Sequence, residues 1–200
     1  MIKRTVCADC ERPLKTCLCD VMVTMSCAYQ VVILQDVKEA KHALSSAPLL
    51  EKSIEGVDRF VGEHFDPHEI FGSAWREETL LVFPSDGALT TEQVVSINFK
   101  NIILLDGTWR KVTRLMHLNP WLSELRCMAI QPDMASQYKI RKSPRDDGLS
   151  TIEAAVAALN ALSPEQDYSA ILPAFYKMID LQIDAMGPAT YQKNYLPESR

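Results

Sequence analysis

The sequence predicts a parallel α/β domain that follows a small N-terminal zinc-binding knuckle. Two observations lead to this fold class: short apolar runs alternate with helical stretches, and four of the six cysteines fall within thirteen residues near the N-terminus. Hydrophobic residues make up 47% and charged residues 24% of the 200 positions, as in ordinary globular proteins. This length allows one main core and a small appendage, so we expect a knuckle at residues 1–22 and a main domain at residues 23–200.

The N-terminal segment CADCERPLKTCLC has the spacing C-x2-C-x6-C-x-C and contains Cys7, Cys10, Cys17 and Cys19. A CxxC turn directs two thiolates at one point, and a nearby CxC can complete a tetrahedral zinc site. Two disulfides or a redox CxxC are the alternatives. They fit less well, because we find no secretion signal and no βαβ unit beside the cysteines. We therefore predict that these four thiolates bind Zn²⁺.

Five short apolar runs are expected to form the strands of the sheet, at 28–36, 58–65, 79–85, 101–107 and 124–132. Helices are expected at 38–54, 109–122, 149–162 and 171–186. In the first of these, Pro48 either breaks the helix or begins a second one. Asn119 and Pro120 end the amphipathic helix that starts at Trp109. Ser150 and Glu153 form an S-x-x-E capping box at the start of an alanine-rich helix.

Ligands bind parallel α/β sheets at the carboxyl ends of the strands, where FPSDG (83–87) and LLDGTW (104–109) are expected to lie. Neither a dinucleotide fingerprint nor a P-loop is present in the sequence. Asp106 is interpreted either as a functional acid or as a turn residue that caps the following helix. Trp109 belongs either to the core or to a platform on which a base stacks.

Charge is unevenly distributed along the chain. Between Gly107 and Arg145 eight basic residues stand against two acidic ones, although the net charge of the chain is −5. This basic segment is interpreted either as a solvated face or as a site for a polyanion. No apolar run is long enough for a membrane span or a signal peptide, so we expect a cytoplasmic protein with no membrane partner.

Three segments together, CADCERPLKTCLC, DGTW and YKIRKSPRDDGLSTIEA, resemble the DTW-domain family of tRNA-uridine aminocarboxypropyltransferases. The resemblance runs in order from about Cys7 to Leu162. It implies a SPOUT-like catalytic domain at 23–200, with helices on both faces of the sheet and a C-terminal trefoil knot around S-adenosylmethionine. It also implies that the 3-amino-3-carboxypropyl group of S-adenosylmethionine is transferred to N3 of a uridine in tRNA, which forms acp3U.

The resemblance further implies roles for single residues. Asp106 would be the general base for uracil N3, Thr108 would orient Asp106, and Trp109 would supply a wall of the pocket. The residues expected to line S-adenosylmethionine are Phe83, Pro84, Ser85, Leu105, Gly107, Leu149, Ser150, Thr151 and Glu153. The residues expected to hold tRNA phosphates are Arg110, Lys111, Arg114, Lys139, Arg141, Lys142 and Arg145.

One stretch departs from the family pattern. Members of the family often carry QHPxE followed by an Asn-Thr pair, whereas this chain has QDVKEAKHALSSA, with Asp36-Val37 and Ser45-Ser46 in those places. We therefore assign no catalytic role within this stretch.

Two other functions are considered: a zinc-dependent RNA-binding module without catalysis, and a SPOUT tRNA methyltransferase. The oligomeric state is left open, with a monomer slightly favoured, and the sequence does not indicate which tRNA or uridine is modified.

Overall fold

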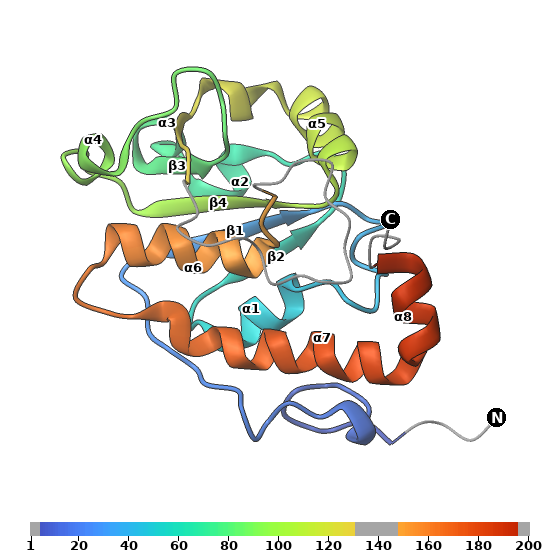
Figure 1. The fold of residues 1–200 in the computed structure, drawn as a ribbon. Helices are drawn as coiled ribbons and strands as arrows, with labels where there is room; N and C mark the ends of the chain where they lie inside the picture. The colour runs from blue at the N-terminus through green and yellow to red at the C-terminus, as the bar shows by residue number, and fades with distance from the viewer. Residues whose placement is uncertain (1–4, 131–147, 196–200) are drawn as a thin grey trace, which may run out of the picture.

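A parallel sheet of five strands lies at the centre of the computed structural model, which describes residues 5–130 and 148–195 (Figure 1). The strands are β1 (Gln30–Gln35), β2 (Asp58–Val61), β3 (Thr79–Val82), β4 (Asn101–Asp106) and β5 (Arg126–Met128). Their order is β2-β1-β4-β3-β5, and every neighbouring pair is parallel. All five predicted strands and their parallel arrangement are confirmed.

Helices connect the strands in the described ranges. The α-helices are α1 (Ala47–Ser53), α2 (Pro67–Phe71), α3 (Trp75–Glu78), α4 (Thr91–Val95), α5 (Trp109–Leu118), α6 (Thr151–Leu162), α7 (Leu172–Met186) and α8 (Pro188–Tyr195). Short 3₁₀ helices are η1 (Leu14–Thr16), η2 (Pro120–Glu124) and η3 (Tyr168–Ile171). The predicted helices α5, α6 and α7 are confirmed, and α5 ends before Asn119-Pro120 as expected.

The two faces of the sheet pack against different helices because successive strand residues point to opposite sides. In β1, Val31 and Ile33 join a core that contains buried residues of α1, α6 and α7. Val32 and Leu34 join a second core with Trp75 of α3 and residues of α2, α5 and η2. Figure 1 shows α6 and α7 below the sheet and α5 above it. The prediction of helices on both faces is confirmed.

The N-terminal knuckle is docked against the main domain. Leu18, between two of the clustered cysteines, is fully buried and belongs to the same core as α6 and α7. Asp20 pairs with Lys177 of α7 over 2.5 Å, and Glu11 pairs with Lys52 of α1 over 3.3 Å. The boundary near residue 22 stays a prediction, but a fully buried leucine belonging to the main core ties the knuckle to that core.

The helix predicted over 38–54 is wrong for its first part, because residues 37–46 form turns and only α1 is helical. Asp36 causes this difference. Its Oδ1 accepts hydrogen bonds from the backbone N–H groups of Lys38 and Glu39, at 2.9 and 3.2 Å, which offers the chain a local alternative to a helix. Pro48 lies in the first turn of α1, so of the two alternatives the proline begins a helix.

The predicted trefoil knot depends on residues 131–147, which lie outside the described residues, and it stays a prediction. Within 5–130 and 148–195, no helix combines the length and the apolarity needed to cross a membrane.

Candidate functional site

Buried acids lie at the carboxyl ends of the two central strands. Asp106 is the last residue of β4, and Asp36 directly follows β1. The parallel register pairs Gln35 with Asp106, and the Asp36 backbone N–H donates to the Asp106 carbonyl over 3.1 Å. Both acidic residues are only 2% exposed. A buried carboxylate without polar partners costs free energy, so Asp36 and Asp106 need such partners. The residues that contact these two acids therefore identify the candidate site.

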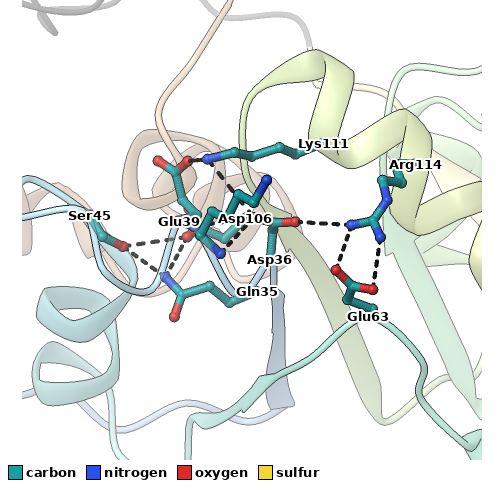
Figure 2. A network of polar contacts seen from close by, with 9 residues as sticks. Gln35, Asp36, Glu39, Ser45, Glu63, Asp106, Lys111 and Arg114 are labelled. Carbon is teal, nitrogen blue, oxygen red and sulfur yellow. Dashed lines mark hydrogen bonds and ion pairs between the residues drawn. The ribbon is translucent and has the colours of Figure 1, made fainter.

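Among the described residues, side chains from three segments contact the Asp106 carboxylate. Gln35 donates from Nε2 to Oδ2 over 2.6 Å, and the hydroxyl of Ser45 lies 3.4 Å from the same oxygen (Figure 2). The Thr151 hydroxyl, at the start of α6, donates to Oδ1. All three partners are buried. The Asp106 carboxylate thus joins β1, the turn before α1 and the N-terminus of α6, and these contacts hold it in one orientation.

A second buried acid, Glu39, lies beside this group in the turns after β1. It is 4% exposed, and its Oε2 accepts a hydrogen bond from Lys111 Nζ over 2.7 Å. The same ammonium group lies 3.9 Å from Asp36 Oδ1 (Figure 2). Lys111 thus compensates two buried carboxylates at once, and removing it would leave uncompensated charge.

Arg114, one turn further along α5, forms a fork with Glu63. Its two terminal nitrogens lie 2.7 and 2.8 Å from the two Glu63 oxygens, and Nη1 lies 3.9 Å from Asp36 Oδ2. The hydrogen bonds from Arg114 lower the pKa of Glu63, and the same bonds raise the pKa of Arg114. Of the basic residues predicted to hold phosphates, Lys111 and Arg114 therefore pair with acids at the site.

The other residues that were predicted to hold tRNA phosphates fall into two groups. Arg110 is exposed in the first turn of α5. Lys139, Arg141, Lys142 and Arg145 lie outside the described residues.

The DGTW segment leads from β4 into α5. Thr108, which is exposed, is the N-cap residue of α5, so the alternative that Asp106 caps this helix is wrong. Gln35, Ser45 and Thr151 are among the partners of the Asp106 carboxylate, whereas the Thr108 side chain makes no capping hydrogen bond. Gly107 has little room, because a Cβ there would lie 3.0 Å from the Cβ of Lys111.

Two predicted site residues from different loops meet at their rings. Phe83, directly after β3, and Trp109, the first residue of α5, have ring centroids 6.1 Å apart and planes tilted by 53°. Both are half-buried, whereas Pro84 and Ser85 are exposed beyond Phe83. This aromatic pair brings the loop after β3 next to the loop after β4, as expected for loops that line one ligand.

The N-terminus of α6 contains the predicted capping box. Glu153 Oε2 accepts hydrogen bonds from the backbone N–H and the hydroxyl of Ser150, at 2.8 and 2.7 Å. The Ser150 hydroxyl in turn accepts the Glu153 N–H over 3.3 Å. These contacts confirm the capping role. Leu149 and Leu105, also predicted to line the donor, are half-buried beside this helix start and in β4.

The four N-terminal cysteine sulfurs converge as the spacing predicts. All lie within 4.8 Å of one another, with Cys7 and Cys19 at 3.5 Å and Cys10 and Cys17 at 3.7 Å. A tetrahedral zinc site with Zn–S distances of about 2.3 Å needs sulfurs about 3.8 Å apart, so the donor set fits this ion. The sulfurs are too far apart for disulfides, and all four cysteines are free.

Hydrogen bonding acts differently on the thiols of the knuckle: hydrogen bonds with Cys17 and Cys7 raise the pKa of Cys19 to about 12, whereas backbone hydrogen bonds favour the thiolate of Cys10. Burial raises the pKa of the Cys10 thiol, but backbone hydrogen bonds from Leu18 and Arg12 outweigh it and bring this pKa to about 7. A thiol that ionises near neutral pH binds metal with a small proton cost, since the thiolate is the ligand.

Sequence reasoning assigned no role to several residues of the site, namely Gln35, Asp36, Glu39 and Ser45, although it noted Asp36 and Ser45 as departures from the family pattern. One signal was available: an acid ends the apolar run of β1 in the same way that Asp106 ends β4. Parallel strands bring such ends together at one edge.

Comparisons with known proteins agree with this geometry. A family model described as the DTW domain matches residues 4–183. The tRNA-uridine aminocarboxypropyltransferase 2 of Drosophila melanogaster is 29% identical over 205 residues, which cover 97% of this chain and 81% of that protein. The Macaca fascicularis protein of the same name is 28% identical over 171 residues, which cover 80% of this chain and 57% of that protein.

A plant relative, tRNA-uridine aminocarboxypropyltransferase A of Arabidopsis thaliana, is 26% identical over 196 residues, covering 82% of this chain and 74% of that protein. Among solved structures, none matches this chain. Because the family model spans nearly the whole sequence, and the acid and tryptophan of its DGTW segment lie at the carboxyl end of the central strand, the chain belongs to the DTW domain family.

Proposed function

We propose that this protein is a tRNA-uridine aminocarboxypropyltransferase that forms acp3U. In the proposed reaction the 3-amino-3-carboxypropyl group of S-adenosylmethionine moves to N3 of a uridine in tRNA. Three similar proteins in different organisms carry the name of this activity. The structural observation that carries the proposal is Asp106, a buried carboxylate fixed at the carboxyl end of β4.

The transfer is a substitution at carbon. Uracil N3 forms a bond to the methylene carbon attached to the sulfonium sulfur, and the carbon–sulfur bond breaks. The bonding electrons stay on sulfur, so methylthioadenosine leaves as the second product. The proton on N3 has to be removed before or during attack, because N3 is a poor nucleophile while it carries that proton. We assign this general-base role to Asp106, supported by its fixed orientation.

The loops around Asp106 support a donor site. A helix N-terminus attracts anions, and α6 begins beside Asp106, so the start of α6 suits the donor carboxylate. Because Ser150 already donates to Glu153 and the Thr151 hydroxyl to Asp106, these donors would contact the donor carboxylate only by exchanging those partners. Gly107, Leu105 and Leu149 line the same edge, and Glu153 fixes the helix start. Phe83 and Trp109 form an aromatic wall for uracil or adenine, with Pro84 and Ser85 next to it and Thr108 at the start of α5.

The tRNA phosphates are proposed to approach along α5. Arg110 is exposed there, and Lys111 and Arg114 follow on the same helix. Since Lys111 and Arg114 already pair with carboxylates, they would contribute to phosphate binding only by sharing or exchanging those partners. The basic residues at 139–145 remain part of this proposed surface.

Zinc in the knuckle is proposed to be structural. Four thiolates fill a tetrahedral site and leave no open position for a water or a substrate. The knuckle is therefore expected to support the fold or the tRNA contact, and the transfer itself is assigned to the sheet edge.

Mass spectrometry of tRNA nucleosides tests the proposal directly. The purified protein is incubated with S-adenosylmethionine and unmodified tRNA, and both the nucleosides and the small product are measured. A uridine that gains the aminocarboxypropyl group, together with methylthioadenosine, is the expected result. A methyl gain with S-adenosylhomocysteine would instead indicate a methyltransferase. Binding of tRNA with neither product would indicate an RNA-binding module without catalysis.

A further inference from the structure

Polar side chains form a continuous row across the carboxyl end of the sheet. Arg59, on the edge strand β2, donates from Nη1 to Gln35 Oε1 over 2.9 Å. Gln35, on β1, donates from Nε2 to Asp106 Oδ2 over 2.6 Å, and Thr151 of α6 approaches the other oxygen of Asp106. The row runs through β2, β1 and β4 to α6. Arg59 thus reaches the proposed catalytic carboxylate through a single buried amide.

The hydrogen-bonding groups of Arg59 and Asp106 decide the orientation of the Gln35 amide. A guanidinium only donates hydrogen bonds, and an ionised carboxylate only accepts them. With its oxygen toward Arg59 and its nitrogen toward Asp106, the amide satisfies both neighbours. Rotated by half a turn, it would place N–H groups against Arg59 and an oxygen against Asp106, which is unfavourable on both sides.

The orientation of the Gln35 amide matters because the side chain is buried. The Gln35 side chain is fully buried, and Ser45 Oγ, 2.8 Å away, also accepts from Nε2. Because the amide is shielded from solvent, water cannot compensate a wrong orientation. Arg59 itself is held from its other side by Glu51, whose Oε2 accepts from Nε over 2.7 Å, and its side chain is 23% exposed. The guanidinium is therefore anchored where it faces the amide oxygen.

We propose that Arg59 is a positioning residue for the transfer reaction, acting on Asp106 through the amide of Gln35. Arg59 selects the amide orientation that presents an N–H donor to Asp106, and this donor helps to hold the carboxylate toward the acceptor. The inference rests on the proposed function, because the position of Asp106 affects the rate only if Asp106 acts on the uridine.

Steady-state kinetics with the full chain test this role. Arg59→Met removes the donor and keeps most of the side-chain length. We expect kcat to fall by a factor on the order of 10 to 100, because small displacements of a reacting group have effects of this size. The KM for S-adenosylmethionine should stay unchanged, since Arg59 acts on the base and not on the donor. Arg59→Lys keeps a cation that donates, and it should recover part of the lost kcat.

Two control variants separate positioning from general stability. Arg76→Met removes an arginine of a more exposed ion pair outside this row, formed with Glu124, and should leave kcat unchanged. Glu51→Gln removes the charge that anchors Arg59 but leaves the contact between Arg59 and Gln35, so its effect on kcat should be much smaller than that of Arg59→Met. Thermal unfolding is measured for each variant.

A double-mutant cycle tests the route through Gln35. In a Gln35→Met background the amide is absent, so adding Arg59→Met should lower kcat no further. A wild-type kcat in Arg59→Met, or an equal fold-loss in both backgrounds, would overturn the inference. If Arg59→Met fails to fold, the shorter, uncharged Arg59→Gln replaces it in both backgrounds with the same criteria.

The two proposals fail in different ways. A wild-type protein that transfers no aminocarboxypropyl group to any tRNA would contradict the proposed function before any variant is made. In that case the link between Arg59 and Gln35 is tested by unfolding alone. Unfolding free energies of the same cycle should be non-additive, and additive values would overturn the link itself.

Discussion

The Thr151 side chain, in the first residue of α6, donates a hydrogen bond to Asp106, the last residue of β4, across 45 positions of sequence. Thr151→Val keeps the shape but leaves Oδ1 of a buried carboxylate without this donor. We expect the free energy of unfolding to fall by about 2 kcal/mol, the scale of hydrogen bonds to charged groups, and kcat to fall about tenfold. Chemical denaturation and transfer kinetics measure the two effects.

Two further variants test that interpretation. Thr151→Ser retains the hydroxyl and should behave nearly as wild type. Thr24→Val removes an exposed hydroxyl that donates to the Lys52 carbonyl, and it should change neither quantity appreciably. Equal losses in Thr151→Ser and Thr151→Val would mean that the methyl packing, and not the hydrogen bond, matters at this position.

Asp106→Asn tests the general base while keeping the size of the side chain. The neutral amide cannot take the N3 proton, so we expect transfer to fall by a factor on the order of 100 to 10,000. Binding of S-adenosylmethionine, measured by calorimetry, should persist. Asp58→Asn, at the exposed start of β2, is the matched control and should keep full activity. Retained transfer in Asp106→Asn would exclude the role as base.

Zinc removal should destabilise the whole molecule and not only the knuckle. Leu18 lies between the proposed ligands Cys17 and Cys19 and is fully buried in the core shared with α6 and α7, so loss of the metal would release a core side chain. We expect about one zinc per chain by elemental analysis. A strong chelator or Cys17→Ser should lower the melting temperature.

Cys27→Ser serves as the control for that experiment, because Cys27 lies outside the cluster of four sulfurs. It should keep its zinc. A chelated protein with an unchanged melting temperature would show that the core holds Leu18 without the metal.

The ion pair between Glu63 and Arg114 predicts a pH dependence of stability. Arg114 lowers the pKa of Glu63 below its ordinary value of 4.5. Because the folded-state pKa is the lower one, the stabilisation is fully present above the ordinary pKa and is lost as the pH falls through the folded value. The difference in melting temperature between wild type and Glu63→Gln should therefore be present at neutral pH and disappear in acid.

The difference in melting temperature between wild type and Glu63→Gln should also shrink in high salt, since the side chains of Arg114 and Glu63 are 49% and 40% exposed to solvent. Glu55→Gln, at an exposed position, should show no such pH-dependent difference. A gap between wild type and Glu63→Gln that persists unchanged in acid would show that this ionisation does not stabilise the fold.

Local patterns predicted the elements, whereas the partners within the site depend on tertiary pairing. The apolar runs of β1 and β4 and the capping box at Ser150 are local signals, and each is confirmed. Gln35 gave no signal, because one amide at the end of a buried run resembles a strand boundary. Arg59 gave none, because its contact requires β2 to lie beside β1.

The basic residues of α5 show a second limit. Their spacing indicates which side of the helix is polar, but it does not indicate which residues of other segments lie against that side. Glu39 and Glu63 come from segments more than 50 positions away, and they occupy Lys111 and Arg114. The turns that carry Glu39 depend in turn on Asp36, which replaces the expected helix with local hydrogen bonds.

The register that places Gln35 opposite Asp106 restricts how the length of the chain can vary. One residue inserted within β1 would turn every following side chain of the strand to the opposite face, moving Gln35 away from Asp106 and exchanging residues between the two cores. An insertion at the exposed turn of Pro164 and Glu165, between α6 and η3, disturbs no strand pairing. Length variation among functional variants of this chain should therefore concentrate in such turns and be excluded from β1.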